Sequence, residues 1–151
     1  MTARTFKYAN RLAKALVQRS GMNLKEAVAA AEVQLEVLRE PTLEELDRTV
    51  HEIAAAAPAI DRLDDPRVDD VYVAANRIIA MAGIFGRDEL GEAAYSLCEL
   101  ITRLRASGKW SSAMVAVHVE ALQVMRRPQD HTPEHTRALR DGLRKIVSAV
   151  A

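Results

Sequence analysis

Hydrophobic residues recur every three or four positions along most of the chain, separated by short polar stretches that contain Gly, Pro or capping residues. This spacing places apolar side chains on one face of an α-helix, whereas a strand would need strict alternation. The pattern predicts seven amphipathic helices and no strand. Their expected ranges are 4–19, 24–39, 42–57, 67–85, 88–107, 111–126 and 133–150.

Capping signals set the expected helix starts in the first third of the chain. Asn23 and Glu26 have the spacing of a capping box, and so do Thr42 and Glu45. Pro41 stands directly before the second box. We therefore expect one helix to end near residue 39 and a separate helix to begin at residue 42.

Proline marks three further boundaries. Pro58 is expected to bend or end the third helix, because proline lacks the backbone N–H that a helix interior needs. Asp65 and Pro66 are typical of an N-cap followed by the first helical residue. Thr132 and Pro133 give the same signal for the last helix.

The short connections between amphipathic helices predict an all-α fold, an antiparallel helical bundle. Residues 42–126 are expected to form an up-and-down four-helix bundle in which the helix at 67–85 is second. We divide the chain into an N-terminal helical pair, 1–40, and a helical bundle, 41–151. The pair would pack on the bundle or form a dimer interface.

Composition and charge limit the classes of partner and the cellular location that we expect for this protein. The 151 residues carry no net charge, but residues 1–25 carry +6, residues 26–70 carry −9 and residues 71–151 carry +3. The basic segment has its nearest counter-charge in the acidic segment that follows, so nucleic acid is not an expected partner. No apolar run approaches the ~18 residues of a membrane span, and the start does not have the pattern of a secretory signal. With a single cysteine, Cys98, we expect a cytoplasmic protein.

The helix at 67–85 carries the most specific pattern. Its apolar arc, expected to face inward, comprises Val68, Val71, Tyr72, Ala75, Ile78, Ile79 and Ala82. Asn76 lies on the flank of this arc, and its helical neighbours are Asp69, Val73, Ala80 and Gly83. Because Ala80 and Gly83 are small, another molecule could approach the backbone closely here.

The stretch from Ala75 to Gly86 resembles the signature helix of histidine phosphotransfer (HPt) domains. In that family an exposed His is followed by Lys three residues on, by Gly four residues on, and by further Gly at seven and ten. The positions that fit are Ala75, Ile78, Ala82, Gly83, Phe85, Gly86 and Leu90.

Several positions depart from the family pattern. Asn76 stands at the phosphoacceptor position, and an amide has no basic nitrogen with which to attack phosphorus. Ile79 replaces the Lys that would neutralise a phosphoryl group, and Ala80 replaces the first Gly. Cys98 stands where an acidic residue often occurs. The resemblance thus implies a degenerate member that takes up no phosphate and is not an enzyme.

Without the phosphoacceptor and its Lys, the resemblance still implies a docking surface. It also implies that this chain takes part in bacterial two-component, phosphorelay or chemotaxis-type signalling. Its expected partner is the receiver domain of a response regulator or a histidine kinase. The residues expected to contact the partner are Asp69, Val73, Asn76, Arg77, Ile79, Ala80 and Gly83.

Two alternatives remain open. The protein could be a helical oligomerisation or scaffold protein, such as a homodimer, that acts through its N-terminal helices. It could also be a phosphotransfer protein that uses His51 or His118, although His118 lies on a broad apolar arc and is expected to be a half-buried, hydrogen-bonded residue. His131 and His135 have no Cys or carboxylate cluster beside them, so neither a metal site nor a cofactor is predicted.

Overall fold

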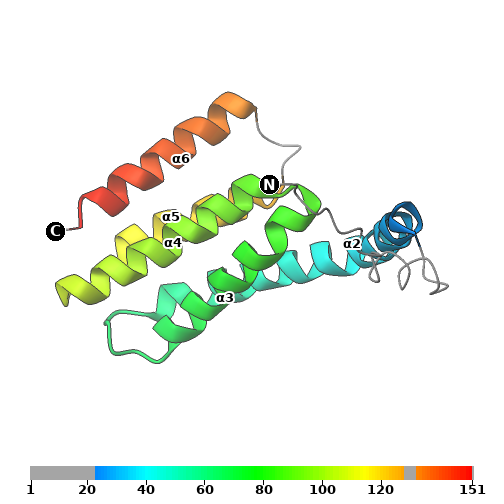
Figure 1. Ribbon diagram of the computed structural model, residues 1–151. Helices are drawn as coiled ribbons and strands as arrows, with labels where there is room; N and C mark the ends of the chain where they lie inside the picture. The colour runs from blue at the N-terminus through cyan, green and yellow to red at the C-terminus, as the bar shows by residue number, and fades with distance from the viewer. Residues whose placement is uncertain (1–22, 128–131, 151) are drawn as a thin grey trace, which may run out of the picture. The chain divides into compact units, whose positions relative to one another are not determined.

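A computed structural model describes residues 23–127 and 132–150, and within these ranges the chain is all-helical and contains no strand. The elements are α2 (Leu24–Ala56), η1 (Ala57–Ala59), α3 (Arg67–Ala82), η2 (Gly83–Phe85), α4 (Asp88–Ser107), α5 (Ser112–Met125) and α6 (Pro133–Ser148) (Figure 1). The chain divides into two compact units, Met1–Val37 and Leu38–Ala151. The helix predicted at 4–19 lies outside the described residues.

α2 is one continuous helix of 33 residues, so the predicted break at Pro41 is wrong. A proline removes one backbone hydrogen bond, and strong helix formers such as the Leu, Glu and Arg residues around it can compensate for that loss. The expected capping box also does not form as predicted. The carboxylate of Glu45 accepts hydrogen bonds from Arg48, farther along the helix, and is therefore engaged away from Thr42.

Other capping predictions are confirmed. The amide N–H of Asn23 donates to Glu26 Oε2, and the amide N–H of Glu26 donates to Asn23 Oδ1, both at 3.0 Å. The side chain of Thr132 accepts the amide N–H of His135 at 3.3 Å and caps α6. α4 spans the predicted range and ends at Ser107; Gly108 follows it with a φ of 67°, the left-handed conformation that glycine favours.

The connection between α2 and α3 differs from the prediction by one residue. α2 ends two residues before Pro58, as expected, but α3 begins at Arg67 and Pro66 occupies the N-cap position. Asp65 still acts as the acceptor, because its Oδ1 binds both the backbone N–H and Nε of Arg67 at 2.9 Å. These hydrogen bonds from Arg67 lower the pKa of Asp65 to about 2.

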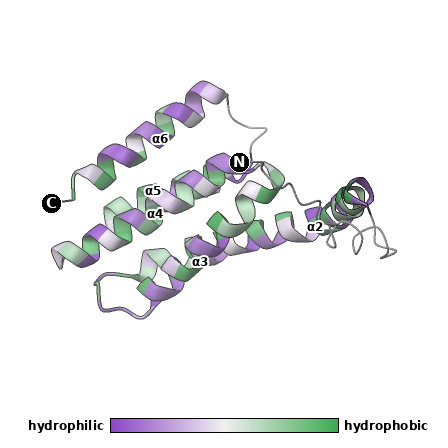
Figure 2. Cartoon of the chain, viewed as in Figure 1, coloured by the Kyte–Doolittle hydropathy of each residue, from purple (hydrophilic) through white to green (hydrophobic). Residues whose placement is uncertain are grey.

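One hydrophobic core joins the C-terminal half of α2 to α3, α4, α5 and α6. α4 is its central element, since it contacts α3, α5 and α6. In Figure 2, hydrophilic and hydrophobic positions alternate along α6, as expected for a helix with one buried face. Large core side chains include Leu46, Ile53, Val68, Ile78, Leu90, Leu97, Leu100, Ile101, Leu122 and Leu143.

The loops at one end of this core are tied together by an aromatic side chain. The indole N–H of Trp110, just before α5, donates to the backbone oxygen of Ile60 at 3.0 Å, and the hydroxyl of Ser112 donates to the same oxygen at 3.1 Å. The connection after α2 is therefore fixed to the start of α5. Within the described ranges, every helix is too short or too polar to cross a membrane.

Candidate functional site

The residues expected to contact a partner lie on α3 and at the first residue of η2, and we call this set the α3 face. It comprises Asp69, Val73, Asn76, Arg77, Ile79, Ala80 and Gly83. All are exposed except Ile79, which is half-buried. The inward arc is confirmed in five positions, whereas Tyr72 and Ile79 at its margins are only half-buried.

Asn76 lies over the seam between α3 and α4. Its Nδ2 donates to the backbone oxygen of Tyr72 at 3.0 Å and approaches Cys98 Sγ at 3.5 Å. Burial raises the pKa of the Cys98 thiol to about 11, so the thiol stays protonated at neutral pH. The centre of the α3 face thus holds a neutral amide and a neutral thiol.

Ion pairs lie on both sides of this neutral centre. Arg77 Nη1 lies 3.5 Å from Glu45 Oε1 and 3.8 Å from Glu52 Oε2, both on α2. Asp69 pairs with Arg105 on α4. These charges already have counter-charges on neighbouring helices, so what the α3 face exposes without a counter-charge is its neutral, partly apolar middle.

The surface beside Asn76 is formed partly by small residues and partly by exposed apolar side chains. A side chain added at Gly83 would meet only Asp88 Oδ1, at 3.9 Å, which leaves room for a partner's backbone. Val73 and Ile84 are each 57% exposed, although both are large apolar residues. A pocket of about 300 Å³ between α2 and α3 borders Val73 and extends this hollowed surface.

His51 is exposed on α2, apart from the α3 face. Its Nδ1 lies 2.8 Å from the backbone oxygen of Asp47 and 3.0 Å from Nη1 of Arg126. Arg126 Nη1 lies 2.9 Å from Nε2, which can accept from it. The imidazole is therefore placed between a carbonyl and a guanidinium.

His118 is fully buried rather than half-buried as expected, because α4 covers it. Its Nδ1–H donates to the backbone oxygen of Met114 at 2.9 Å, which leaves Nε2 to accept the hydroxyl of Ser96 at 3.1 Å. Burial lowers the pKa of His118. The imidazole is thus a neutral, fully hydrogen-bonded core group that no partner can reach without moving α4 or α5.

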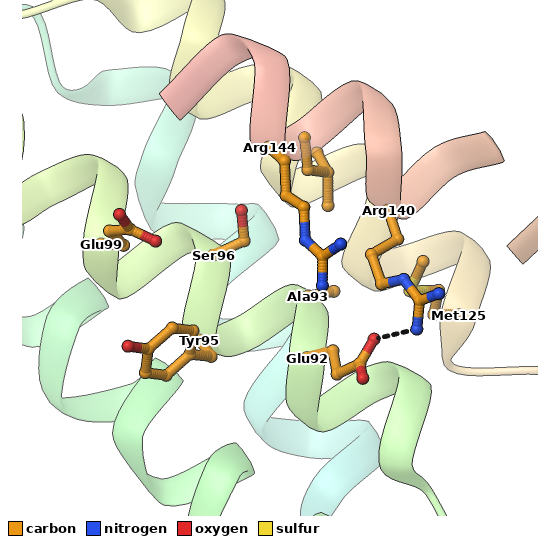
Figure 3. A pocket seen from close by; sticks show the side chains of 9 residues that line it. Glu92, Ala93, Tyr95, Ser96, Glu99, Met125, Arg140 and Arg144 are labelled. Atoms are coloured by element: carbon orange, nitrogen blue, oxygen red, sulfur yellow. Dashed lines mark hydrogen bonds and ion pairs between the residues drawn. The ribbon is translucent and has the colours of Figure 1, made fainter. Parts of the chain in front are cut away.

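A second hollow, which we call the α4–α6 pocket, was not predicted. It has a volume of about 270 Å³ and opens between α4 and α6, with Met125 of α5 beneath it (Figure 3). Arg140 and Arg144 reach toward it from α6, while Glu92, Tyr95, Ser96 and Glu99 line it from α4. Its remaining lining residues are Ala93 and Leu143.

Among residues 23–127 and 132–150 there is no cluster of three or more His, Cys, Asp or Glu side chains that could hold a metal ion. His135 is exposed at the start of α6, and His131 lies outside the described residues.

Comparisons with protein-family models, with curated proteins and with solved structures each found no match. The resemblance to HPt domains therefore rests on the residues of this chain alone, chiefly those between Ala75 and Leu97.

Proposed function

We propose that the protein is a non-catalytic, HPt-like signalling protein that binds a receiver domain or a histidine kinase through the α3 face. The observation that carries this proposal is the exposure of Asn76 at the phosphoacceptor-equivalent position, beside the small residues Ala80 and Gly83. A cytoplasmic location and a bacterial two-component, phosphorelay or chemotaxis-type pathway belong to the same proposal.

The architecture is consistent with this proposal. The C-terminal half of α2 would be the first helix of an up-and-down four-helix bundle, followed by α3, α4 and α5. Short connections between these helices favour antiparallel neighbours. α3 would then be the second helix, which is where the family resemblance places the docking residues.

The chemistry of the α3 face argues for binding without phosphotransfer. Asn76 offers an amide donor, and the neighbouring thiol of Cys98 is protonated at neutral pH. The half-buried Ile79 supplies no cation. A partner that carries a phosphoryl group would find neither a nucleophile nor charge neutralisation at this position.

Partner binding is supported by the shape and polarity of the same surface. Exposed large apolar side chains are typical of protein contacts, and Val73 on α3 and Ile84 on η2 are two such side chains. The neutral middle lets an opposing helix pack without leaving a buried charge unpaired.

Substitution of Ala80 tests this proposal. Arg ranks near Ala in helix propensity, so Ala80→Arg should leave the melting temperature nearly unchanged, yet it places a long charged chain in the contact. We expect the purified wild type to capture receiver-domain or kinase proteins from a bacterial lysate and Ala80→Arg to lose them. Ala138→Arg, at an exposed position on α6, is the matched control and should retain them.

Two results would contradict the proposal. The first is capture of neither protein class by the wild type. The second is an acid-labile, base-stable phosphoryl label on the wild type after incubation with a phosphorylated receiver. A label that mapped to His51 or His118 would instead favour an active phosphotransfer protein.

A scaffold function is the second candidate, and one observation favours it. Every residue from 23 to 38 is exposed, including the apolar stripe that the sequence predicts for this helix. The stripe comprises Leu24, Val28, Ala31, Leu35 and Leu38. If it joins two chains, Val28→Glu with Leu35→Glu should convert a dimer into a monomer by light scattering; a monomeric wild type would exclude this candidate.

A further inference from the structure

The α4–α6 pocket combines an apolar floor with charged walls. Ala93, Met125 and Leu143 are buried beneath it. Its volume of about 270 Å³ is just below the ~300–1,000 Å³ that is typical of small-molecule sites. It therefore suits a compact ligand with a short apolar body.

Arg140 and Arg144 stand one helical turn apart, so their like charges repel each other. Arg140 Nη1 is held by Glu92 Oε2 at 2.9 Å, which fixes the guanidinium beside the pocket (Figure 3). Its Nε is buried and has no hydrogen-bond partner among the described residues. Because its guanidinium is fixed in place, Arg140 keeps a positive charge at the wall of the pocket.

Arg144 is less firmly paired than Arg140. The nearest carboxylate oxygen, Asp141 Oδ1, is 3.9 Å from Arg144 Nη1, and both side chains are more than half exposed. Glu99 also lines the pocket, but its Oε1 accepts Nε and Nη2 of Arg103 at 3.2 and 2.9 Å. The guanidinium of Arg144, which reaches toward the pocket in Figure 3, is thus available to an anion.

Ser96 provides a complementary acceptor. Its hydroxyl proton is committed to Nε2 of His118, because Nδ1 of that imidazole donates to the backbone oxygen of Met114. The lone pairs of Ser96 Oγ remain, and they can accept a hydrogen bond from a ligand hydroxyl or amino group.

From these contacts we infer that the α4–α6 pocket binds a small organic carboxylate with a hydroxyl or amino group next to the carboxylate, such as an α-hydroxy acid. The carboxylate pairs with the guanidinium of Arg144, and the positive charge of Arg140 lies at the same wall of the pocket. The hydroxyl or amino group donates to Ser96, and a short alkyl chain covers Met125 and Leu143. Guanidinium groups match the planar, two-oxygen geometry of a carboxylate.

NMR titration of the ¹⁵N-labelled full chain with 2-hydroxyisocaproate tests this inference. We expect saturable shifts of the amides in residues 92–99 and 140–144, and weaker binding of 4-methylpentanoate, which lacks only the hydroxyl. Arg144→Gln should weaken binding by about tenfold or more, as expected for loss of a charged hydrogen bond. Arg137→Gln removes the same charge from an exposed position of α6 outside the pocket and should change affinity by less than about twofold.

Three outcomes would overturn the inference: no saturable shifts, an equal loss of affinity in Arg137→Gln, or inorganic phosphate binding as tightly as the hydroxy acid. Ser96→Ala should reduce the preference for 2-hydroxyisocaproate over 4-methylpentanoate while both still bind. The titration contains no partner protein, so its result is independent of the function proposed for the α3 face.

Discussion

Protonation of His118 should destabilise the fold below neutral pH. The imidazole is fully buried, its Nδ1–H is used by the backbone oxygen of Met114, and its Nε2 accepts the hydroxyl of Ser96. A second proton would put a positive charge into the core and remove the acceptor that Ser96 uses. Burial therefore lowers the pKa of His118 below its ordinary value of 6.5.

The pH window and the magnitude follow from linkage. Below pH 6.5 the unfolded chain binds a proton at this imidazole while the folded chain does not, so stability falls as the pH decreases. One such group contributes at most about 1.4 kcal/mol per pH unit. Between pH 6.5 and 5.0 the loss is at most about 2 kcal/mol, and it stops below the folded pKa.

Urea unfolding followed by circular dichroism at pH 7.5, 6.5, 5.5 and 5.0 measures this loss. His118→Gln keeps a neutral polar side chain of similar length and removes the titration. We expect it to be less stable than the wild type at pH 7.5 but to show a flatter pH dependence. The other titrating groups are common to both proteins and cancel in the comparison.

The reasoning fails if wild-type stability is constant between pH 7.5 and 5.0, or if His118→Gln has the same slope as the wild type. Ser96→Ala separates the hydrogen bond from the charge. It should cost about 1–3 kcal/mol at pH 7.5, because it leaves the buried Nε2 without a donor, while the slope with pH remains.

Three further predictions concern other parts of the chain. The Cys98 thiol, whose pKa is raised to about 11, should react slowly with iodoacetamide at pH 8 in the folded protein and rapidly in urea; fast native labelling would refute its burial. Gly86→Ala should lower the free energy of unfolding, measured in urea, by about 1–2 kcal/mol, because the φ of Gly86 is 67°. Gly142 lies on a helix with open space around it, so Gly142→Ala should raise the free energy of unfolding by up to about 1 kcal/mol. Asp65→Asn should lower the melting temperature at pH 7. The difference between the two melting temperatures should narrow as the pH falls from 3.8 toward 2, because the carboxylate paired with Arg67 then becomes protonated in the wild type. A difference that does not depend on pH would contradict this assignment.

Local signals explain what could be predicted from the sequence. Helix boundaries such as Asn23 with Glu26, or Gly108 after α4, depend on atoms within three or four residues of one another. The break at Pro41 was mispredicted because proline is compatible with both the first turn of a helix and a tolerated interior site. The residues around Pro41 do not distinguish these two cases, and in the structure α2 continues through it.

The two candidate sites also differ in whether local sequence patterns can predict them. All but one residue of the α3 face lie on α3, so their exposure follows from a period of 3.6 residues. The α4–α6 pocket depends on Glu92 meeting Arg140, which is 48 positions away, and on Ser96 meeting His118, which is 22 positions away. No periodic pattern encodes such contacts, because they form only when α4, α5 and α6 pack together.

The α3 face also shows why a single change would not convert this protein into a phosphotransfer protein. An imidazole at position 76 would lie against the protonated thiol of Cys98, which cannot stabilise an imidazolium as a carboxylate would. No cation would stand beside the phosphoryl group, because residue 79 is Ile and Arg77 already pairs with Glu45 and Glu52 on α2. The wild type thus lacks a nucleophile, an orienting group and a counter-charge at this position, which agrees with the proposal that the α3 face binds a partner without phosphotransfer.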